Sequence, residues 1–329
     1  MSRAFATFAP GKVSADALAH GANLWGGKGF GLMQMCADKL PVPPGFVLST
    51  ELCAVYQKNP AKTMEAIAQS LPAWLEELKE HFGYMPLLSV RSGARVSMPG
   101  MMDTVLNVGL ADSTRDAWIK RVGPSCTGDS EARLHHMFKT VVGKECPNDV
   151  TQQILACIAA VFDSWNSPRA KTYRQLHKIP QEWGTAVTVQ AMVFGNMGDT
   201  SGTGVAFTRD PSSGAPGVVG EFLQNAQGED VVAGIKKPGP LTDIRKLVSI
   251  PCHNNLIALL KKLELKYRDM QDVEFTIQDG ALWLLQTRAG KRSAAAAFRI
   301  ASDLVDEGVI TLEEARERVT FDQFVMAQR

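Results

Sequence analysis

The stretch that decides the fold runs from Thr185 to Gly234 and reads TAVTVQAMVFGNMGDTSGTGVAFTRDPSSGAPGVVGEFLQNAQGEDVVAG. A β-rich run from Thr185 to Phe194 enters a glycine-rich turn, a second run from Gly204 to Thr208 leaves it, and a third follows from Val218 to Leu223. Two strands joined by glycine, serine and threonine favour a hairpin that covers the phosphates of a nucleotide, because glycine lets backbone N–H groups approach an anion closely. An ordinary tight connection would produce the same pattern, so the rest of the chain has to distinguish the two.

Composition narrows the class of protein. A length of 329 residues predicts two domains or one large two-lobed unit. A net charge of +1 predicts no general attraction to nucleic acid or to anionic lipid. The N-terminus has no apolar core typical of a signal peptide and no segment is long enough to span a bilayer, which predicts a cytoplasmic protein that does not bind membranes. The six cysteines form no C-x-x-C pair, so reduced thiols are expected rather than disulfides or zinc.

The first segment whose residues suit binding or catalysis is WGGKGFGLM, from Trp25 to Met33. It is not a Walker A loop, because Gly29 rather than serine or threonine follows Lys28. A lysine that extends from a glycine turn can neutralise phosphate, and a solvated loop lysine is the alternative. A short helix is expected after the turn, ended by the prolines that follow it.

An apolar run from Pro86 to Arg91 predicts a buried strand that ends in an arginine before a Ser/Gly turn. The guanidinium fork of Arg91 suits phosphate oxygens. The loop that follows, Ser92 to Thr104, carries three methionines around Pro99 and Gly100. These methionines could fill the core, but their place in a turn favours a mobile lid.

Near the C-terminus the chain predicts a β-hairpin, because Asp279-Gly280 separates two alternating runs. Alternation places Asp272 and Glu274 on one face of the first strand and Gln286 and Arg288 together on one face of the second, the face that also carries Leu284. Two carboxylates, an amide and an arginine on neighbouring strands suit Mg²⁺ and phosphate. An exposed sheet face with cross-strand charge pairing is the alternative.

Helical spacing of apolar residues predicts the remaining elements. Pro72 is expected to divide a helical segment into two, and Ser167-Pro168 to interrupt another. The predicted helices cover residues 60–82, 130–142, 149–176, 255–267, 293–306 and 311–319, the last with Thr311 as its N-cap.

Together these segments resemble the N-terminal nucleotide-binding domain of the pyruvate phosphate dikinase family. The resemblance rests on GGKG with LPVPPGF, SVRSGARVSMPGMMDTVLNVGL, WGTAVTVQAMVFGNMGDTSGTGVAFTRDP, GEFLQNAQGEDVVAGI and MQDVEFTIQDGALWLLQTRAGKR, which follow the order of the family and cover nearly the whole chain. It is weakest between Ala111 and Val150.

The resemblance implies an α+β ATP-grasp fold of two lobes with the nucleotide between them. It implies an N-terminal lobe over residues 1–110, a helical insertion that is shorter than usual over residues 111–183, and a C-terminal lobe over residues 184–329.

The resemblance also implies a set of site residues for Mg·ATP. Lys28, Arg91 and Arg288 correspond to residues that contact the phosphates, and Arg288 to an essential one. Asp272, Glu274 and Gln286 correspond to residues that hold Mg²⁺. The other nucleotide contacts that it implies fall into three groups. Over the phosphates it implies Gly100, Met102, Thr203 and Gly204, and along the adenine pocket Gln190, Met192 and Val193. Near the ribose and adenine it implies Glu221 and Glu229.

The implied activity is transfer of a phosphoryl group from ATP to a histidine on a separate chain or to another acceptor. A full-length dikinase also has a phosphohistidine domain and a domain that binds pyruvate or phosphoenolpyruvate, and this sequence contains neither, nor the family's TSHAA-type motif. The chain alone is therefore not expected to interconvert pyruvate and phosphoenolpyruvate. The alternatives are a catalytically idle nucleotide-binding regulator that binds a partner such as a full-length dikinase, and a fragment of a longer enzyme.

Overall fold

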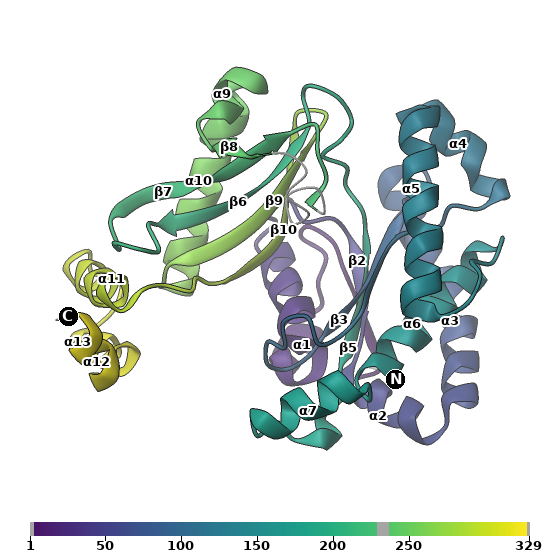
Figure 1. Ribbon diagram of the computed structural model, residues 1–329, viewed down its shortest axis with the longest axis horizontal. Helices are drawn as coiled ribbons and strands as arrows, with labels where there is room; N and C mark the ends of the chain where they lie inside the picture. Colours follow the sequence, from purple (N-terminus) through teal and green to yellow (C-terminus); the bar gives the residue numbers. More distant parts are fainter. Residues whose placement is uncertain (1–2, 229–236, 328–329) are drawn as a thin grey trace. The chain divides into compact units, whose positions relative to one another are not determined.

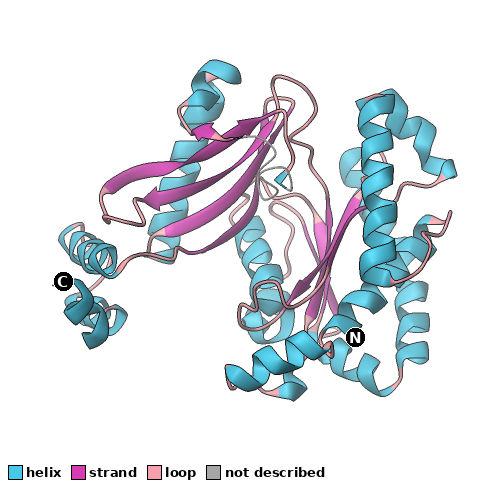
Figure 2. Cartoon of the chain, viewed as in Figure 1, coloured by secondary structure: helices cyan, strands magenta, loops and turns pink. Residues whose placement is uncertain are grey.

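The computed structural model describes residues 3–228 and 237–327, which separate into two compact units. The first unit ends at Met192 and the second begins at Val193. Each unit contains a five-stranded antiparallel sheet with helices packed on it, as Figure 2 shows, so the α+β class is confirmed. No helix among the described residues is long and apolar enough to cross a membrane.

The sheet of the first unit has the strand order β1-β2-β5-β3-β4. Its central part is deeply buried, because every residue of β2 and β5 is inaccessible to solvent. Its strands are β1 (Phe5–Phe8), β2 (Gly45–Leu48), β3 (Leu88–Gly93), β4 (Thr104–Val108) and β5 (Ala186–Ala191).

The helices of this unit confirm most of the predicted pattern. The predicted interruption at Ser167-Pro168 separates α6 from α7, with Ser167 as the N-cap of α7. Helix α4 had no counterpart among the predicted helices. The helices are α1 (Ala15–Ala37), α2 (Thr50–Lys58), α3 (Pro60–Phe82), α4 (Asp112–Val122), α5 (Pro124–Met137), α6 (Val150–Ser164) and α7 (Pro168–Leu176), with a π-helical turn at Phe138–Val142 and a 3₁₀ turn at Gln181–Trp183.

The predicted division of the helix at Pro72 is wrong, because α3 runs unbroken from Pro60 to Phe82. Pro72 lies on the exposed side of α3, between the buried residues Leu71 and Trp74. On that side the carbonyl group that loses its hydrogen bond to the proline can bind water instead. The buried side of α3 keeps the parts of the helix before and after Pro72 on one packing surface.

The sheet of the second unit has the order β10-β9-β6-β7-β8, and Figure 1 shows α10 lying along one of its faces. Val273, Phe275 and Ile277 alternate along β9 as fully buried residues. The strands are β6 (Gly202–Arg209), β7 (Pro216–Gln224), β8 (Gly239–Pro240), β9 (Gln271–Gln278) and β10 (Ala281–Ala289). The helices are α9 (Asp243–Leu247), α10 (Ile250–Tyr267), α11 (Ala294–Asp306), α12 (Leu312–Arg318) and α13 (Phe321–Ala327).

The predicted hairpin between Thr185 and Thr208 is wrong. Strand β5 pairs with β2 and β3 in the first sheet, whereas β6 pairs with β7 and β9 in the second. The hairpin that does form joins β6 to β7 through a tight turn, in which Gly214 N donates to the carbonyl of Asp210 at 2.8 Å. The strand β5 is buried on both faces, so it suits the middle of a sheet and takes partners that are distant in sequence.

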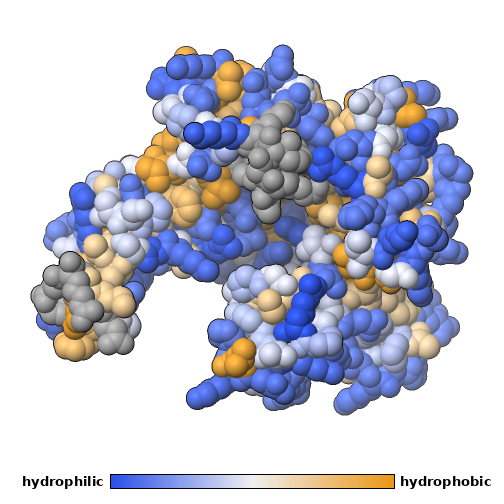
Figure 3. All heavy atoms as spheres, viewed as in Figure 1, coloured by the Kyte–Doolittle hydropathy of each residue, from blue (hydrophilic) through white to orange (hydrophobic). Residues whose placement is uncertain are grey.

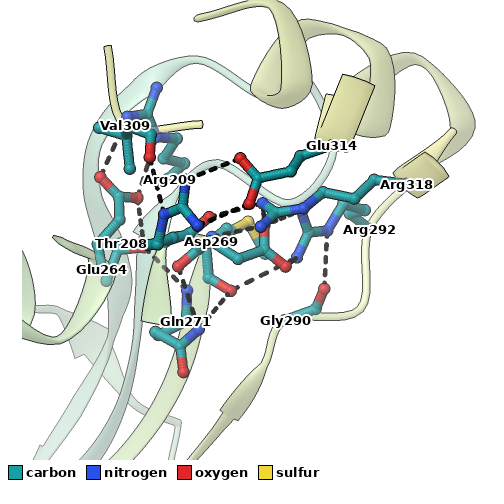
Figure 4. A network of polar contacts seen from close by, with 12 residues as sticks. Thr208, Arg209, Glu264, Asp269, Gln271, Gly290, Arg292, Val309, Glu314 and Arg318 are labelled. Carbon is teal, nitrogen blue, oxygen red and sulfur yellow. Dashed lines mark hydrogen bonds and ion pairs between the residues drawn. The ribbon is translucent and has the colours of Figure 1, made fainter. Parts of the chain in front are cut away.

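A network of ion pairs attaches the C-terminal helices to the end of the second sheet (Figure 4). Arg209, only 3% exposed, pairs with Glu264 at 3.0 Å and with Glu307 at 2.7 Å. Burial alone would lower the pKa of Arg209, but its hydrogen bonds to Glu307 and Glu264 outweigh burial and raise that pKa. Arg292 pairs with Asp269 at 2.7 Å beside it. The network joins β6 to α10 and to the end of α11.

Candidate functional site

Lys28 lies in a helix rather than in the predicted glycine turn. Helix α1 breaks at Gly26, where φ is 69° and ψ is 161°, and Lys28 stands in the first turn of the helical segment that follows. Gly27 N donates to the carbonyl of Ala94 at 2.9 Å. A Cβ atom at Gly26 would lie 1.9 Å from the carbonyl oxygen of Gly93, so only glycine allows this approach. The GGKG motif therefore attaches Lys28 to the end of β3.

Arg91 lies on β3, between Thr104 of β4 and Thr188 of β5. Its Nη2 donates to Oε1 of Gln190, and Nε2 of Gln190 donates to the carbonyl of Pro43 at 2.8 Å. Gln190 is 2% exposed. A chain of three residues from three motifs therefore fixes the direction of the Arg91 side chain.

The two predicted phosphate cations of the first unit occupy the same side of β3. Arg91 and Gly93 are two residues apart on this strand and so share a face. The Cβ atom of Lys28 lies 3.7 Å from the position that a Cβ at Gly93 would take. The fold thus brings together two cations that are 63 positions apart in the sequence.

The methionine-rich loop packs against helices α6 and α7 of its own unit. Met98 is 7% exposed and forms a buried cluster with Trp165 and Ala170, against which Met101 and Met102 lie half-buried. This packing favours the core-filling interpretation of Met98 over the lid. Gly100 is exposed at the tip of the turn, where Met101 N donates to the carbonyl of Met98 at 3.2 Å.

The predicted adenine-pocket residues fall on both sides of the division between the units. Gln190 and Met192 belong to the first unit, and Val193, 6% exposed, begins the second. The sulfur of Met192 accepts a hydrogen bond from Asn107 N at 3.0 Å. Their roles toward adenine stay predictions.

In the second unit, three predicted site residues form a row across the sheet. Val205 of β6 pairs with Glu221 of β7 and with Glu274 of β9, and Glu274 pairs with Gln286 of β10. Residues that pair directly across antiparallel strands point to the same face. This face lies opposite Val273, Phe275 and Ile277 of β9, and Figure 3 shows an apolar patch over β6 and β7.

The alternation predicted for β10 is wrong at one point. A bulge between Leu284 and Gln286 shifts the register, so Trp283 pairs with Thr276 and Gln286 pairs with Glu274. Gln286 therefore shares a face with Trp283 and not with Leu284, because one extra residue moves the side chains that follow to the other face. The prediction that Gln286 and Arg288 share a face is confirmed, since both pair with acidic residues on one face of β9.

Asp272 is held by Arg288 through only one of its two oxygens. Nε and Nη2 of Arg288 both lie 2.7 Å from Oδ2 of Asp272. The side chain of Asp272 is 6% exposed and that of Arg288 is 53% exposed. Oδ1 of Asp272 is buried and accepts no hydrogen bond from any described residue.

A buried carboxylate oxygen without a donor is the feature that a cation would satisfy. Mg²⁺ takes oxygen ligands in octahedral geometry and keeps several water or phosphate oxygens. Oδ1 of Asp272, the carboxylate of Glu274 and the amide oxygen of Gln286 fit such a set. Among the described residues no group of three or more histidine, cysteine, aspartate or glutamate side chains is placed to hold a metal ion.

The glycine-rich connection from Phe194 to Ser201 is closed by hydrogen bonds within the second unit. Phe194 N donates to Oε1 of Gln278 at 2.7 Å, and Gly198 N donates to Oδ1 of Asn225 at 3.1 Å. Gly195 N donates to Oε1 of Gln227 at 3.1 Å. Side chains accept hydrogen bonds from these three N–H groups. This favours an ordinary tight connection over a phosphate-binding loop for this part of the stretch.

Thr203 and Gly204 lie on β6 and not in the loop. The Thr203 hydroxyl donates to the carbonyl of Phe275 at 3.2 Å. A Cβ atom at Gly204 would lie 2.5 Å from the ring of Phe275, so sheet packing by itself requires glycine there. Glu221 is exposed on β7, and Glu229 lies outside the described residues.

The contacts that sequence reasoning missed are the amide contacts of Gln190, Asn225 and Gln227. Each of these side chains organises a motif to which it does not belong in sequence. No local pattern signals such contacts, because an amide side chain in a strand or a turn has many possible partners.

Two antiparallel sheets, with Lys28 and Arg91 at the first and two carboxylates on the second, fit the class of nucleotide-binding α+β proteins. The sequence model of the family described as pyruvate phosphate dikinase, AMP/ATP-binding domain, matches residues 59–250 and 251–308. The chain therefore belongs to this family. Lys28 precedes the matched range, but the full-length relatives extend over it.

Three relatives illustrate the similarity. The chain is 44% identical to pyruvate, phosphate dikinase of Clostridium symbiosum over 90% of its own length and 40% of that protein. It is 42% identical to the Rhizobium meliloti enzyme over 95% of the chain and 42% of that protein. It is 41% identical to the chloroplastic enzyme of Flaveria pringlei over 90% of the chain and 37% of that protein.

The chain spans about two fifths of the length of these relatives. Membership of the family therefore does not by itself assign the activity of the whole enzymes to this chain. The alignment with the Clostridium symbiosum enzyme covers 354 residues and is longer than this chain of 329. That relative therefore contains residues within the aligned region that this chain lacks. The cytoplasmic compartment stays a prediction.

Proposed function

We propose that the chain binds Mg·ATP through an ATP-grasp fold and transfers a phosphoryl group to a histidine on a separate chain. The observation that carries this proposal is the gathering of the predicted residues into two groups. Lys28 and Arg91 share one face at the end of β3. Asp272, Glu274, Gln286 and Arg288 share one face of β9 and β10.

Phosphoryl transfer requires alignment and neutralisation of phosphate charge more than covalent chemistry by the protein. In this proposal Lys28 and Arg91 bind phosphate oxygens from the first unit, and Arg288 binds them from the second. Mg²⁺, when bound, neutralises further charge on the phosphates. Asp272, Glu274 and Gln286 hold that ion through oxygen atoms. The acceptor imidazole needs no protein base.

The remaining predicted residues and boundaries belong to the same proposal. Gly100, Met102, Thr203 and Gly204 lie over the phosphates, Met192 and Val193 line the adenine pocket, and Glu221 and Glu229 lie near the ribose and adenine. The proposed three-part division has boundaries after residues 110 and 183, whereas the two compact units meet after Met192. In the structure the helices between these two positions belong to the first compact unit.

The product nucleotide tests the proposal. The chain is incubated with ATP, Mg²⁺ and a separately purified phosphohistidine domain of a pyruvate phosphate dikinase. We expect phosphohistidine on the added domain and release of AMP. ADP formed without the added domain would indicate a different acceptor and would overturn the proposed transfer. Tight ATP binding without turnover under every condition would also overturn it and would identify a nucleotide-binding regulator.

A further inference from the structure

The amide of Gln190 has a single chemically possible orientation. A guanidinium group only donates hydrogen bonds and a peptide carbonyl only accepts them. The oxygen of Gln190 must therefore face Arg91 and its nitrogen must face Pro43, as the structure has them. With 2% of its surface exposed, the side chain has almost no room to turn.

This contact fixes the charge and the direction of Arg91. The acceptor is a neutral amide, so this contact itself does not offset the positive charge of the guanidinium. One of its five donors is bound on the β5 side, and this orients the planar fork before any ligand arrives. A side chain that is already oriented loses less conformational entropy on binding.

We propose that Gln190 is a positioning residue for Arg91, so that it governs affinity for the phosphates and not for the adenine ring. This inference rests on the proposed function. It replaces the adenine-pocket role that sequence similarity implies for Gln190, because both ends of this buried amide are already engaged. Pro43 of the LPVPPGF motif fixes the amide through its carbonyl.

The test compares four ligands. Gln190→Met keeps the length of the side chain and removes both hydrogen bonds. Dissociation constants for ATP, ADP, AMP and adenosine are measured by titration calorimetry on parent and variant. A hydrogen bond to a charged group is worth about 1.5 kcal/mol or more, so we expect about tenfold weaker ATP binding. Adenosine affinity is expected to stay unchanged, and equal losses for ATP and adenosine would overturn the inference.

Two controls separate positioning from general damage. Gln153→Met changes another buried glutamine of the same unit, one that bonds only Gly109, Leu110 and Pro147. It is expected to leave ATP affinity unchanged. In an Arg91→Met background, Gln190→Met is expected to have no further effect on ATP affinity. A full tenfold loss in that background would show that Gln190 acts without Arg91 and would overturn the inference.

The outcomes distinguish this inference from the proposed function. A parent chain that binds none of the four ligands contradicts ATP binding itself. A parent chain that binds ATP, with a Gln190→Met variant that loses adenosine affinity, contradicts only the positioning role.

Discussion

Arg91 in the first unit and Arg288 in the second are both predicted to bind phosphate, yet partners of different charge hold their side chains. Arg91 is bound by the neutral amide of Gln190. Arg288 is bound by the carboxylate of Asp272, at 2.7 Å. The contact with Gln190 therefore brings no negative charge to Arg91, whereas Arg288 shares its charge with an acidic partner.

The same contrast appears at the buried structural arginines. Arg174 of the first unit is fully buried and donates to the carbonyl of Trp165 and to the amide oxygen of Gln181. Burial lowers its pKa. Arg209 of the second unit is buried among carboxylates. Arg174 therefore donates to neutral acceptors, whereas Arg209 pairs with carboxylates.

The largest expected effect tests Arg288. Arg288→Ala is expected to lower the rate of phosphoryl transfer about a thousandfold, because an arginine that stabilises transferring phosphate contributes on that scale. The rate of phosphohistidine formation measures it. Arg299→Ala is the control, since Arg299 lies on α11 with a side chain 49% exposed. A loss of less than tenfold would show that Arg288 does not stabilise the phosphoryl group that is transferred.

Removal of an acidic partner tests the buried arginine of the second unit. Glu264→Gln is expected to lower the free energy of unfolding by about 3 kcal/mol, because it leaves a buried guanidinium with less compensating charge. Urea denaturation measures this change. Glu313→Gln makes the same change at an exposed position on α12 and should alter stability by less than about 0.5 kcal/mol. Equal effects of the two variants would contradict the importance of the Arg209 network.

Removal of the neutral partner of a buried arginine in the first unit should lower the free energy of unfolding by less. Gln181→Met is expected to lower the free energy of unfolding by about 1 kcal/mol, since Gln181 is exposed and water can replace its oxygen. The same urea experiment measures it, with Gln175→Met on α7 as the exposed control. A loss as large as that of Glu264→Gln would remove the contrast between the units.

The smallest effect concerns the Arg288–Asp272 pair. Asp272→Asn is expected to raise affinity for ATP about threefold in the presence of EDTA, because the half-exposed Arg288 is released from an ion pair of modest strength. It should also reduce the gain in ATP affinity that Mg²⁺ produces, since a ligand oxygen loses its charge. Calorimetric titration with and without Mg²⁺ measures both, and Asp306→Asn is a charge-matched control on α11. Unchanged binding under both conditions would show that Asp272 neither restrains Arg288 nor holds a cation.

Local patterns predicted the elements whose signals are contained in a few residues. The Asp279-Gly280 turn produced the β9–β10 hairpin, and Thr311 caps α12 through its bond to Glu314. Turn and cap signals are reliable because the atoms that interact are close in sequence. The pairing of β5 with β2 and β3 has no such signal.

The sequence by itself determined the family of this chain, and it predicted Lys28, Arg91 and Arg288 as residues that bind phosphate. Only the tertiary structure decided that β5 and β6 belong to different sheets, that a bulge turns Gln286 toward Glu274, and that Gln190 holds Arg91. The physical reason is that strand partners and buried amide contacts join residues about 100 positions apart, where packing of the whole unit selects one partner among many.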